Sequence, residues 1–583
     1  MFKFKKPLKV TNGRIVDADG NEVRLWGINY YLPFNNNYVN IEEMGVDHLK
    51  AVDRDIADFK RMGVELVRMH VYEREITDLY GNIVENDHLR IMDYLIDKLE
   101  AAGIYVMMTP IVWYNTVVNQ LSVTKHYAYW SAEKCETFSY ANLFPNHAMV
   151  WHEKALEYQE NYLNQFFARK NVFSGKRLDE YDSVVVVEVS NETVYPCPDL
   201  LCQLREERQK GGTNPLKLDE MTILDMYDEY RMQTGVEDTK DLMQQFCIDL
   251  VKKYLDRMFG IVDKYFKNSV LKSHIHYGFN DPGMFSCLEH APINCISVTC
   301  YAPCYFDTSY NDRNDFLENM RDIHQTYQPL LPMQKGFIAY EFDAPTTLLG
   351  HPMGAFGYTL ASMGVQIAAH FTYTPMDVAA YNPGWIVHYM NLRHTPTKAA
   401  AFIAAGEIFR NTPFQAPMSQ SSKRWQGDHY IVDVEKDLVV YQDEQSFIYS
   451  NPCESVQPCE NAPARIVGSG SSQFVTHEGN GVLLLEKAAE DTLHLTVLPN
   501  QWYVNDPYRG KSFRFMANRY VDTNREWIVS RLRENGTDFQ LHYAGFENYT
   551  VSRLENGQSI DVIVTNGIFR ADPGEYVIKA VRG

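Results

Sequence analysis

Eight apolar, strand-like runs in the first 410 residues constrain the fold more than any other feature. They begin at Val23, Val64, Ile104, Val184, Val270, Cys295, Gly336 and Gln366. Amphipathic helical stretches alternate with them, near residues 52–62, 88–102, 147–169, 240–266 and 395–409. Eight strands alternating with helices predict a parallel (β/α)8 barrel. An open doubly wound sheet is the alternative, and it is disfavoured because no Gly-rich phosphate loop follows the first strand.

The pattern changes near residue 415, where the helical rhythm stops. Short alternating strands follow, at 429–434, 437–441, 492–497 and 559–564. We therefore expect a barrel over residues 1–414 and a separate β-sandwich domain over residues 415–583. Residues 10–24 are expected to form a β-hairpin that caps the bottom of the barrel.

Two insertions interrupt the barrel pattern. Residues 114–146 are rich in aromatic side chains, and residues 194–240 are rich in charge. Both follow the carboxyl ends of predicted strands, where the loops of a barrel build its binding site. They are therefore candidate walls of a cleft.

Net charge and hydropathy exclude some partners. The chain has 55 Lys and Arg against 75 Asp and Glu, a net charge of −20 that would repel nucleic acid and anionic membranes. No apolar run reaches the 18 residues expected of a membrane span, so we expect no membrane insertion. Residues 1–10 are basic without the apolar stretch of a secretory leader. A cytoplasmic location, or a secreted or periplasmic one if a leader was removed, both remain open.

The cysteines indicate no metal site. No Cys/His cluster has the spacing of a zinc centre. Cys453 and Cys459 lie in a polar, turn-rich loop that a disulfide could staple, which favours export. Cys295, Cys300 and Cys304 lie in or beside an apolar run and are expected to be reduced core thiols.

Two glutamates, Glu192 and Glu341, stand where the fourth and the seventh apolar runs give way to polar sequence. In a parallel barrel the carboxyl ends of the strands face one pocket. Retaining glycoside hydrolases use one carboxylate to attack the anomeric carbon and one carboxylic acid to protonate the leaving oxygen, with the two groups about 5 Å apart. Asn191 fits beside the acid, because an amide can hold a sugar hydroxyl in the transition state.

Several motifs within residues 8–410 resemble clan A glycoside hydrolases, particularly the family 5 cellulase and mannanase group or a close neighbour. The stretch 15–29, IVDADGNEVRLWGIN, resembles the opening of that family, and 63–68, GVELVR, resembles its second strand. The strongest local match is 171–183, NVFSGKRLDEYDS, followed by the valine run and Ser190-Asn191-Glu192. It resembles the family's approach to its acid/base residue.

The resemblance implies a role for each residue of the site. Glu192 would be the acid/base and Glu341 the nucleophile. Arg68 would lie beneath the nucleophile, where a cation keeps a carboxylate ionised. Tyr301 would hydrogen-bond the nucleophile.

The sequence departs from the family pattern at two places. Thr299 stands where the family often has His, and Phe371 or Tyr373 stands where it has the Trp that floors a sugar subsite. For four other side chains near predicted strand ends, a place in the pocket and a place in the core both remain open: His70, Trp113, His276 and His370. Glu188 shares the face of Glu192 but should lie deeper.

These patterns predict a retaining β-glycosidase that acts on β-linked oligo- or polysaccharides by double displacement, without a metal or organic cofactor. β-Mannosides, β-glucosides and β-galactosides all remain open as substrates. The 114–146 insertion favours a pocket for terminal sugars over an open cleft. The alternatives are a transglycosylase on the same site and a catalytically retired carbohydrate-binding protein.

Overall fold

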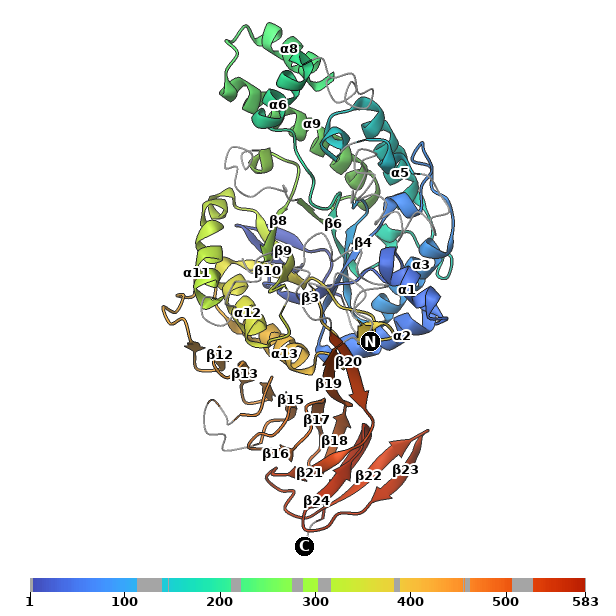
Figure 1. Ribbon diagram of the computed structural model, residues 1–583, viewed down its shortest axis with the longest axis vertical. Coiled ribbons are helices and arrows are strands. Elements are labelled where there is room, and N and C mark those ends of the chain that lie inside the picture. The colour runs from blue at the N-terminus through green and yellow to red at the C-terminus, as the bar shows by residue number, and fades with distance from the viewer. Residues whose placement is uncertain are drawn as a thin grey trace.

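The computed structural model describes residues 4–112, 139–144, 146–210, 222–274, 287–301, 316–345, 347–381, 388–453, 456, 462–505 and 528–581. Its centre is a closed, parallel eight-stranded barrel in the order β10-β3-β4-β5-β6-β7-β8-β9 (Figure 1). The strands are β3 (Leu25–Asn29), β4 (Leu66–His70), β5 (Tyr105–Thr109), β6 (Val184–Glu188), β7 (Leu271–His274), β8 (Cys295–Tyr301), β9 (Gly336–Asp343) and β10 (Val365–His370). Each lies within or closely overlaps one predicted run, so the barrel prediction is confirmed.

Helices pack around the barrel in the described part of the chain. They are α1 (Asn35–Glu43), α2 (His48–Met62), α3 (Asp87–Ala102), α5 (Glu153–Ala168), α9 (Lys240–Phe266), α11 (Phe316–Thr326), α12 (His351–Met363) and α13 (Pro396–Asn411). Asp47 accepts a hydrogen bond from the Lys50 amide at the start of α2, and Gly63 ends that helix in the left-handed conformation. Helices α1, α11 and α12 were not predicted.

The charged insertion contains two helices, α6 (Pro198–Gln209) and α8 (Thr222–Thr234). In Figure 1 they form the end of the molecule opposite the C-terminal strands. Most of the aromatic insertion, residues 113–138, lies outside the described residues. Among the described residues, no helix has the length and hydropathy needed to cross a membrane.

A hairpin closes the amino-terminal end of the barrel, as predicted. It consists of β1 (Lys9–Thr11) and β2 (Arg14–Val16). The Gln366 side chain of β10 accepts a hydrogen bond from the Ile15 amide and donates one to the Ile15 carbonyl, both at 2.7 Å. A Cβ on Gly336, the first residue of β9, would lie 2.8 Å from Ile15 Cγ1, so this close approach requires glycine. The hairpin therefore packs tightly against β9 and β10 at the amino-terminal end of the barrel.

The C-terminal region is all β, as predicted. Its large sheet has the order β11-β12-β13-β14-β15-β17-β18-β25-β22-β23, and a smaller sheet has the order β16-β21-β24. The large sheet comprises β11 (Arg424–Gln426), β12 (Tyr430–Asp433), β13 (Leu438–Gln442), β14 (Ser446–Tyr449), β15 (Arg465–Ser469), β17 (Val482–Ala489), β18 (Thr492–Val497), β22 (Tyr549–Glu555), β23 (Gln558–Val562) and β25 (Gly574–Ala580). The smaller one comprises β16 (Val475–His477), β21 (Thr537–Leu541) and β24 (Ile568–Ala571). Apolar residues from both sheets form one buried cluster.

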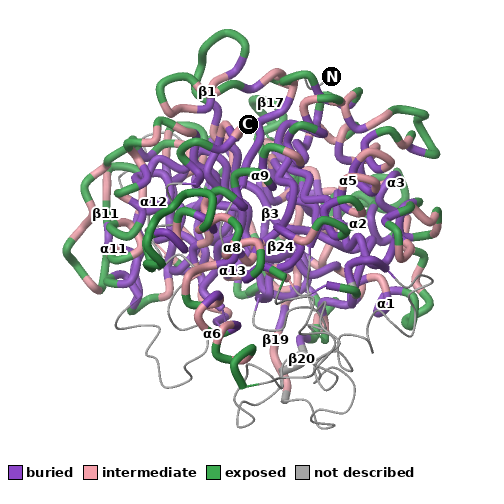
Figure 2. Tube along the Cα trace, turned by 90° about the horizontal axis from the view of Figure 1, so that it is seen from above, coloured by how far each residue is buried: buried purple, intermediate pink, exposed green. Residues whose placement is uncertain are grey.

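The other face of the large sheet packs on the barrel helices α12 and α13. Along β13 the side chains alternate: Val440 joins the cluster between the two sheets, whereas Val439 joins the buried cluster of the barrel. Gly354 of α12 permits the contact, because a Cβ there would lie 2.8 Å from methyl groups of both Val432 and Val439. Figure 2 shows the buried backbone gathered in the middle of the molecule. The barrel and the large sheet therefore share a hydrophobic core.

A second contact joins the C-terminal region to the barrel. The hairpin of β19 (Asn500–Asn505) and β20 (Ile528–Arg533) runs up from the C-terminal strands to the barrel (Figure 1). There Ser530 Oγ lies 2.9 Å from His394 Nδ1, and the Tyr503 hydroxyl donates to the His394 carbonyl at 3.0 Å. His394 belongs to the segment that links β10 to α13.

Candidate active site

Arg68, on β4, is the centre of a buried polar network at the carboxyl end of the barrel. Its Nη1 donates to Glu341 Oε1 at 2.8 Å and to Asn29 Oδ1 at 3.0 Å. Its Nη2 donates to Asn191 Oδ1 at 2.6 Å, and its Nε donates to Glu188 Oε2 at 3.1 Å. Burial disfavours the guanidinium charge, but the carboxylates of Glu188 and Glu341 raise the pKa of Arg68. One cation thus joins the ends of strands β3, β4, β6 and β9.

Glu341 is held in a cage of donors. It is 2% exposed. Besides the bond from Arg68, its Oε2 accepts a hydrogen bond from the Tyr301 hydroxyl at 2.6 Å, and its Oε1 lies 3.4 Å from His70 Nε2. Burial alone would raise the pKa of Glu341, but hydrogen bonds from His70 and Tyr301 and the charge of Arg68 outweigh it and lower that pKa. The carboxylate is therefore ionised at neutral pH, as a nucleophile requires.

His70 is a neutral neighbour of this carboxylate. It ends β4 and is 1% exposed. Burial, and then the charge of Arg68, lower the pKa of His70 to about 4 although Glu341 opposes the shift. An uncharged imidazole beside Glu341 leaves Arg68 as the cation that pairs with it.

A β-bulge in β9 brings two consecutive side chains into the barrel. Ala339 pairs with Val298 of β8, but the next β8 residue, Thr299, pairs with Glu341, which leaves Tyr340 as the extra residue. Strict alternation would send Tyr340 and Glu341 to opposite faces. Because of the bulge, Glu341 reaches the β4 arginine while the Tyr340 ring lies 4.5 Å from the same guanidinium.

Glu192 lies on a strained turn four residues after the end of β6. Its φ is +41°, in the left-handed region that costs a non-glycine residue about 1–3 kcal/mol. Ser190 Oγ and Thr193 Oγ1 lie 2.6 Å apart and hold this turn. The Tyr340 hydroxyl donates to Glu192 Oε1 at 3.3 Å. A residue that contacts Glu192 is thus the chain neighbour of Glu341.

Glu188 lies deeper than Glu192, as expected, although it ends β6 and Glu192 lies on the turn beyond that strand. It is fully buried and accepts hydrogen bonds from Arg68 and, at 3.1 Å, from Thr109 Oγ1. Burial raises the pKa of Glu188 although Arg68 opposes the shift. Its place beneath the network suits a support of Arg68 rather than a group that meets substrate.

At one of the two departures from the family pattern, the structure distinguishes between the two aromatic residues, Phe371 and Tyr373. Phe371, directly after β10, packs against His70 and Tyr31, with ring centres 5.9 Å and 6.2 Å apart. Tyr373 instead packs against Tyr30 and Phe59, behind the barrel wall. Phe371 is therefore the aromatic residue beside the glutamate cage.

The remaining candidates divide into two groups. Trp113 and His276 lie outside the described residues. His370 points away from the cage: its Nε2 lies 3.0 Å from Asp343, and its ring packs against Phe342 and Phe402 of α13. His370 therefore belongs to the core, which was one of its two expected roles. Sequence reasoning missed Tyr340, because the alternation rule places it on the wrong face.

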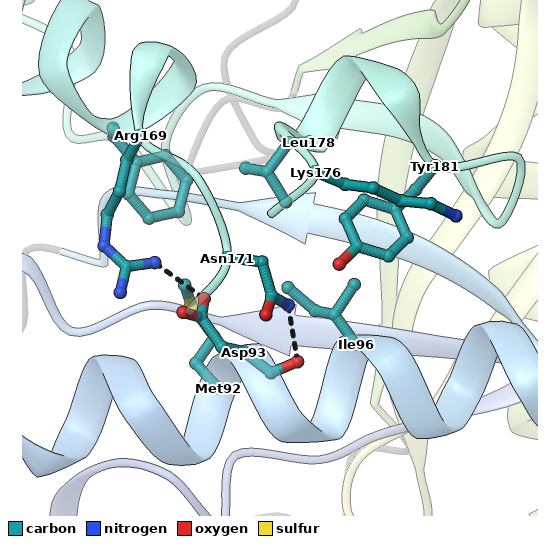
Figure 3. Close-up of a pocket in the computed structure, with 9 residues that line it drawn as sticks. Met92, Asp93, Ile96, Arg169, Asn171, Lys176, Leu178 and Tyr181 are labelled. Carbon is teal, nitrogen blue, oxygen red and sulfur yellow. Dashed lines mark hydrogen bonds and ion pairs between the residues drawn. The ribbon is translucent and has the colours of Figure 1, made fainter. Parts of the chain in front are cut away.

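A pocket at the opposite end of the barrel involves the segment with the strongest family resemblance. Residues 169–181 precede β6 and line the pocket together with α3 (Figure 3). Arg169 pairs with Asp93 at 2.6 Å, and the Asn171 amide donates to the Asp93 carbonyl at 2.8 Å. These polar groups satisfy one another, so this loop supports the approach to β6 and lies far from Glu192.

Within the described part of the chain, no group of three or more His, Cys, Asp or Glu side chains is placed to hold a metal ion. Cys295 and Cys300 are buried free thiols, as predicted. The proposed partner of Cys453, Cys459, and the third predicted core thiol, Cys304, lie outside the described residues.

Comparison with known proteins gives matches among solved structures. No family model matches the chain, and no curated protein matches it. The endo-β-1,4-mannanase from Thermotoga petrophila is similar with 9% identity and a TM-score of 0.45, over 95% of this chain and 98% of that one. The family 5 mannosidase from Rhizomucor miehei has 13% identity and a TM-score of 0.43, over 69% and 97%. The GH5-4 broad-specificity endoglucanase from Ruminococcus champanellensis has 10% identity and a TM-score of 0.39, over 66% and 95%. The solved structures that the chain resembles thus include family 5 glycoside hydrolases.

Proposed function

We propose that the protein is a retaining β-glycosidase that hydrolyses β-linked mannosides, glucosides or galactosides. The Glu341 carboxylate attacks the anomeric carbon and forms a glycosyl ester, while Glu192 gives its proton to the departing oxygen. Glu192, now a carboxylate, takes a proton from water. That water attacks the anomeric carbon, the ester bond breaks, and Glu341 is released. Two inversions leave the β configuration unchanged.

The observation that carries this proposal is the cage around Glu341. A buried carboxylate is normally protonated more easily than an exposed one. Here a hydrogen bond from His70, the Arg68 guanidinium at 2.8 Å and the Tyr301 hydroxyl at 2.6 Å hold the pKa of Glu341 below its ordinary value. An ionised carboxylate at this end of the closed barrel suits attack on an electron-poor carbon.

Glu192 supplies the second support. It is partly exposed, unlike Glu341, and accepts a hydrogen bond from the tyrosine that precedes Glu341. A more open carboxyl group can exchange protons with a leaving group and with water. The strained turn directs it to this position, and strain of this kind is common at catalytic sites. Asn191 and Arg68 anchor the same turn through their 2.6 Å hydrogen bond.

Stereochemistry tests the mechanism directly. Proton NMR of the anomeric signals during cleavage of aryl β-mannosides, β-glucosides and β-galactosides should show β-sugar first and identify the glycone. Products longer than the substrate would indicate transfer to sugar instead of water. Initial α-sugar would refute the role of Glu341 as nucleophile. No cleavage of any of these or of the matching polymers would favour a carbohydrate-binding protein.

Azide separates the two glutamate roles. With an aryl glycoside whose leaving group needs no proton, Glu192→Ala should still form the glycosyl-enzyme, and added azide should release β-glycosyl azide. Glu341→Ala should give α-glycosyl azide, because azide then attacks the substrate directly. Glu407→Ala removes a glutamate that pairs with Arg410 on α13 and serves as the matched control. Unchanged turnover in either active-site variant would exclude that glutamate from the proposed catalytic role.

A further inference from the structure

A second acidic residue, Asp343, follows Glu341 by two positions and is fully buried at the end of β9. Three side chains surround it: Lys398 Nζ at 2.9 Å and His370 Nε2 at 3.0 Å from Oδ1, and His388 Nδ1 at 3.0 Å from Oδ2. Burial would raise the pKa of Asp343, but Lys398 and the two histidines lower it much further. Asp343 is therefore an ionised carboxylate.

This carboxylate orients His388. An ionised carboxylate can only accept hydrogen bonds. Nδ1 of His388 therefore carries a proton and donates a hydrogen bond to Asp343. Lys398, on α13 and fully buried, already balances the charge of Asp343. The contact with His388 therefore fixes the direction of an imidazole ring rather than neutralising a charge.

The fixed ring lies against the cage of Glu341. The centre of the His388 ring is 4.9 Å from that of Tyr301 and 5.1 Å from that of Phe371, which stands edge-on to it at 89°. His388 is 2% exposed. Its ring thus packs against both Phe371 and the tyrosine whose hydroxyl meets Glu341 Oε2 at 2.6 Å.

The backbone that carries His388 is held from two directions. The Thr374 amide donates to the Met390 carbonyl at 2.8 Å, which ties the segment to the end of β10. The β19–β20 hairpin of the C-terminal region contacts His394 through Ser530 and Tyr503. The segment from His388 to His394 is therefore tied both to the end of β10 and to the C-terminal region.

We propose that Asp343 and His388 form a positioning pair that holds the Tyr301 ring so that its hydroxyl stays on the carboxylate of Glu341. The pair acts through Tyr301 and does not itself take part in bond making. The expected effect of the pair on turnover rests on the proposed function of Glu341. The expected effect of the pair on the pKa of the Glu341 carboxyl group does not depend on turnover.

The test uses His388→Asn in the full chain, because an Asn side chain keeps a donor for Asp343 and removes the ring that confines Tyr301. His351→Asn is the matched control: His351 is also fully buried, and its Nδ1 lies 2.8 Å from Asp437 Oδ1, in the contact with the C-terminal sheet. Carbon-13 NMR of protein labelled at glutamate carboxyl carbons follows the pKa of Glu341, whose signal is identified by its loss in Glu341→Gln.

His388→Asn should raise the pKa of Glu341 by about one unit or more, the size expected when a hydrogen bond to a carboxylate is lost. It should lower kcat/KM about tenfold at pH values below the wild-type pKa of Glu341, and less between the wild-type pKa and the new one. In a Tyr301→Phe background the same substitution should change both quantities far less. His351→Asn should leave both at the wild-type values.

Each outcome decides between the two proposals. If His388→Asn leaves the pKa of Glu341 and kcat/KM as they are in His351→Asn, the positioning pair is refuted and the hydrolase proposal stands. If the effects of His388→Asn and Tyr301→Phe on kcat/KM multiply in full in the double variant, transmission through Tyr301 is refuted. If the wild-type protein cleaves no glycoside but His388→Asn still shifts the pKa of Glu341, the pair stands and the hydrolase proposal falls.

Discussion

Removal of one hydroxyl group, in Tyr301→Phe, tests the electrostatics of the site most directly. The hydroxyl donates to Glu341 Oε2 at 2.6 Å, and a hydrogen bond to a charged group contributes about 1.5–3 kcal/mol. At 1.36 kcal/mol per pKa unit, its loss should raise the pKa of Glu341 by about 1–2 units. The ring stays, so its packing against His388 should survive.

The assay is the pH dependence of kcat/KM on an aryl β-glycoside. The acid limb reports the ionisation of the free nucleophile, so it should move to higher pH by about 1–2 units in the variant. Tyr265→Phe is the control, because its hydroxyl donates to the Asn164 carbonyl at 2.9 Å on the outside of the barrel. An acid limb at the wild-type position in a stably folded Tyr301→Phe protein would refute the assignment of Glu341 as the titrating nucleophile.

Three further predictions concern stability and pH. Arg68→Gln leaves two buried carboxylates without their cation and should lower the free energy of unfolding by about 3–5 kcal/mol in urea titrations; a loss under 1 kcal/mol would show that the network relaxes. Gly354→Val forces methyl groups into the valines of the C-terminal sheet and should cost about 1–3 kcal/mol in thermal unfolding. Gly260→Ala, in helix α9 with open space around it, should instead be neutral or stabilising, and equal effects of the two would refute the close contact. The pKa of His70 is about 4 in the folded protein against an ordinary value of 6.5, so its contribution to stability is complete above pH 6.5 and is lost as the pH falls, by up to about 3 kcal/mol near pH 4. His70→Gln should flatten the pH dependence of stability between these two pH values. A curve parallel to that of the wild-type protein would contradict a neutral buried imidazole.

Local patterns predicted the barrel well because they reflect local physics. The β8 run, Cys295–Tyr301, and helix α9, Lys240–Phe266, match their predicted ranges, since their apolar residues follow one period and their ends carry turn or capping residues. Helix α12 was missed for the opposite reason. All thirteen of its residues are buried, because the barrel covers one side and the C-terminal sheet the other. A helix enclosed in this way carries no amphipathic stripe.

The candidate site was predicted in part. Arg68, Tyr301 and Glu341 meet as the resemblance implied. Tyr340 was not predicted, because a one-residue bulge reverses the side of the strand on which it lies. His388 was missed because it lies in a segment after β10 that carries neither a strand nor a helix pattern.

The sequence by itself determined the eight barrel strands, five of the helices around them and the two glutamates near the carboxyl ends of β6 and β9, because side-chain periodicity and capping act over a few residues. Only the tertiary structure decided which side chains surround Glu341. Its donors come from β4 and β8, and the imidazole that confines Tyr301 comes from the segment after β10. Their meeting depends on barrel closure, on the bulge in β9 and on the C-terminal hairpin that holds the segment of His388. These are long-range contacts, and no local pattern encodes them.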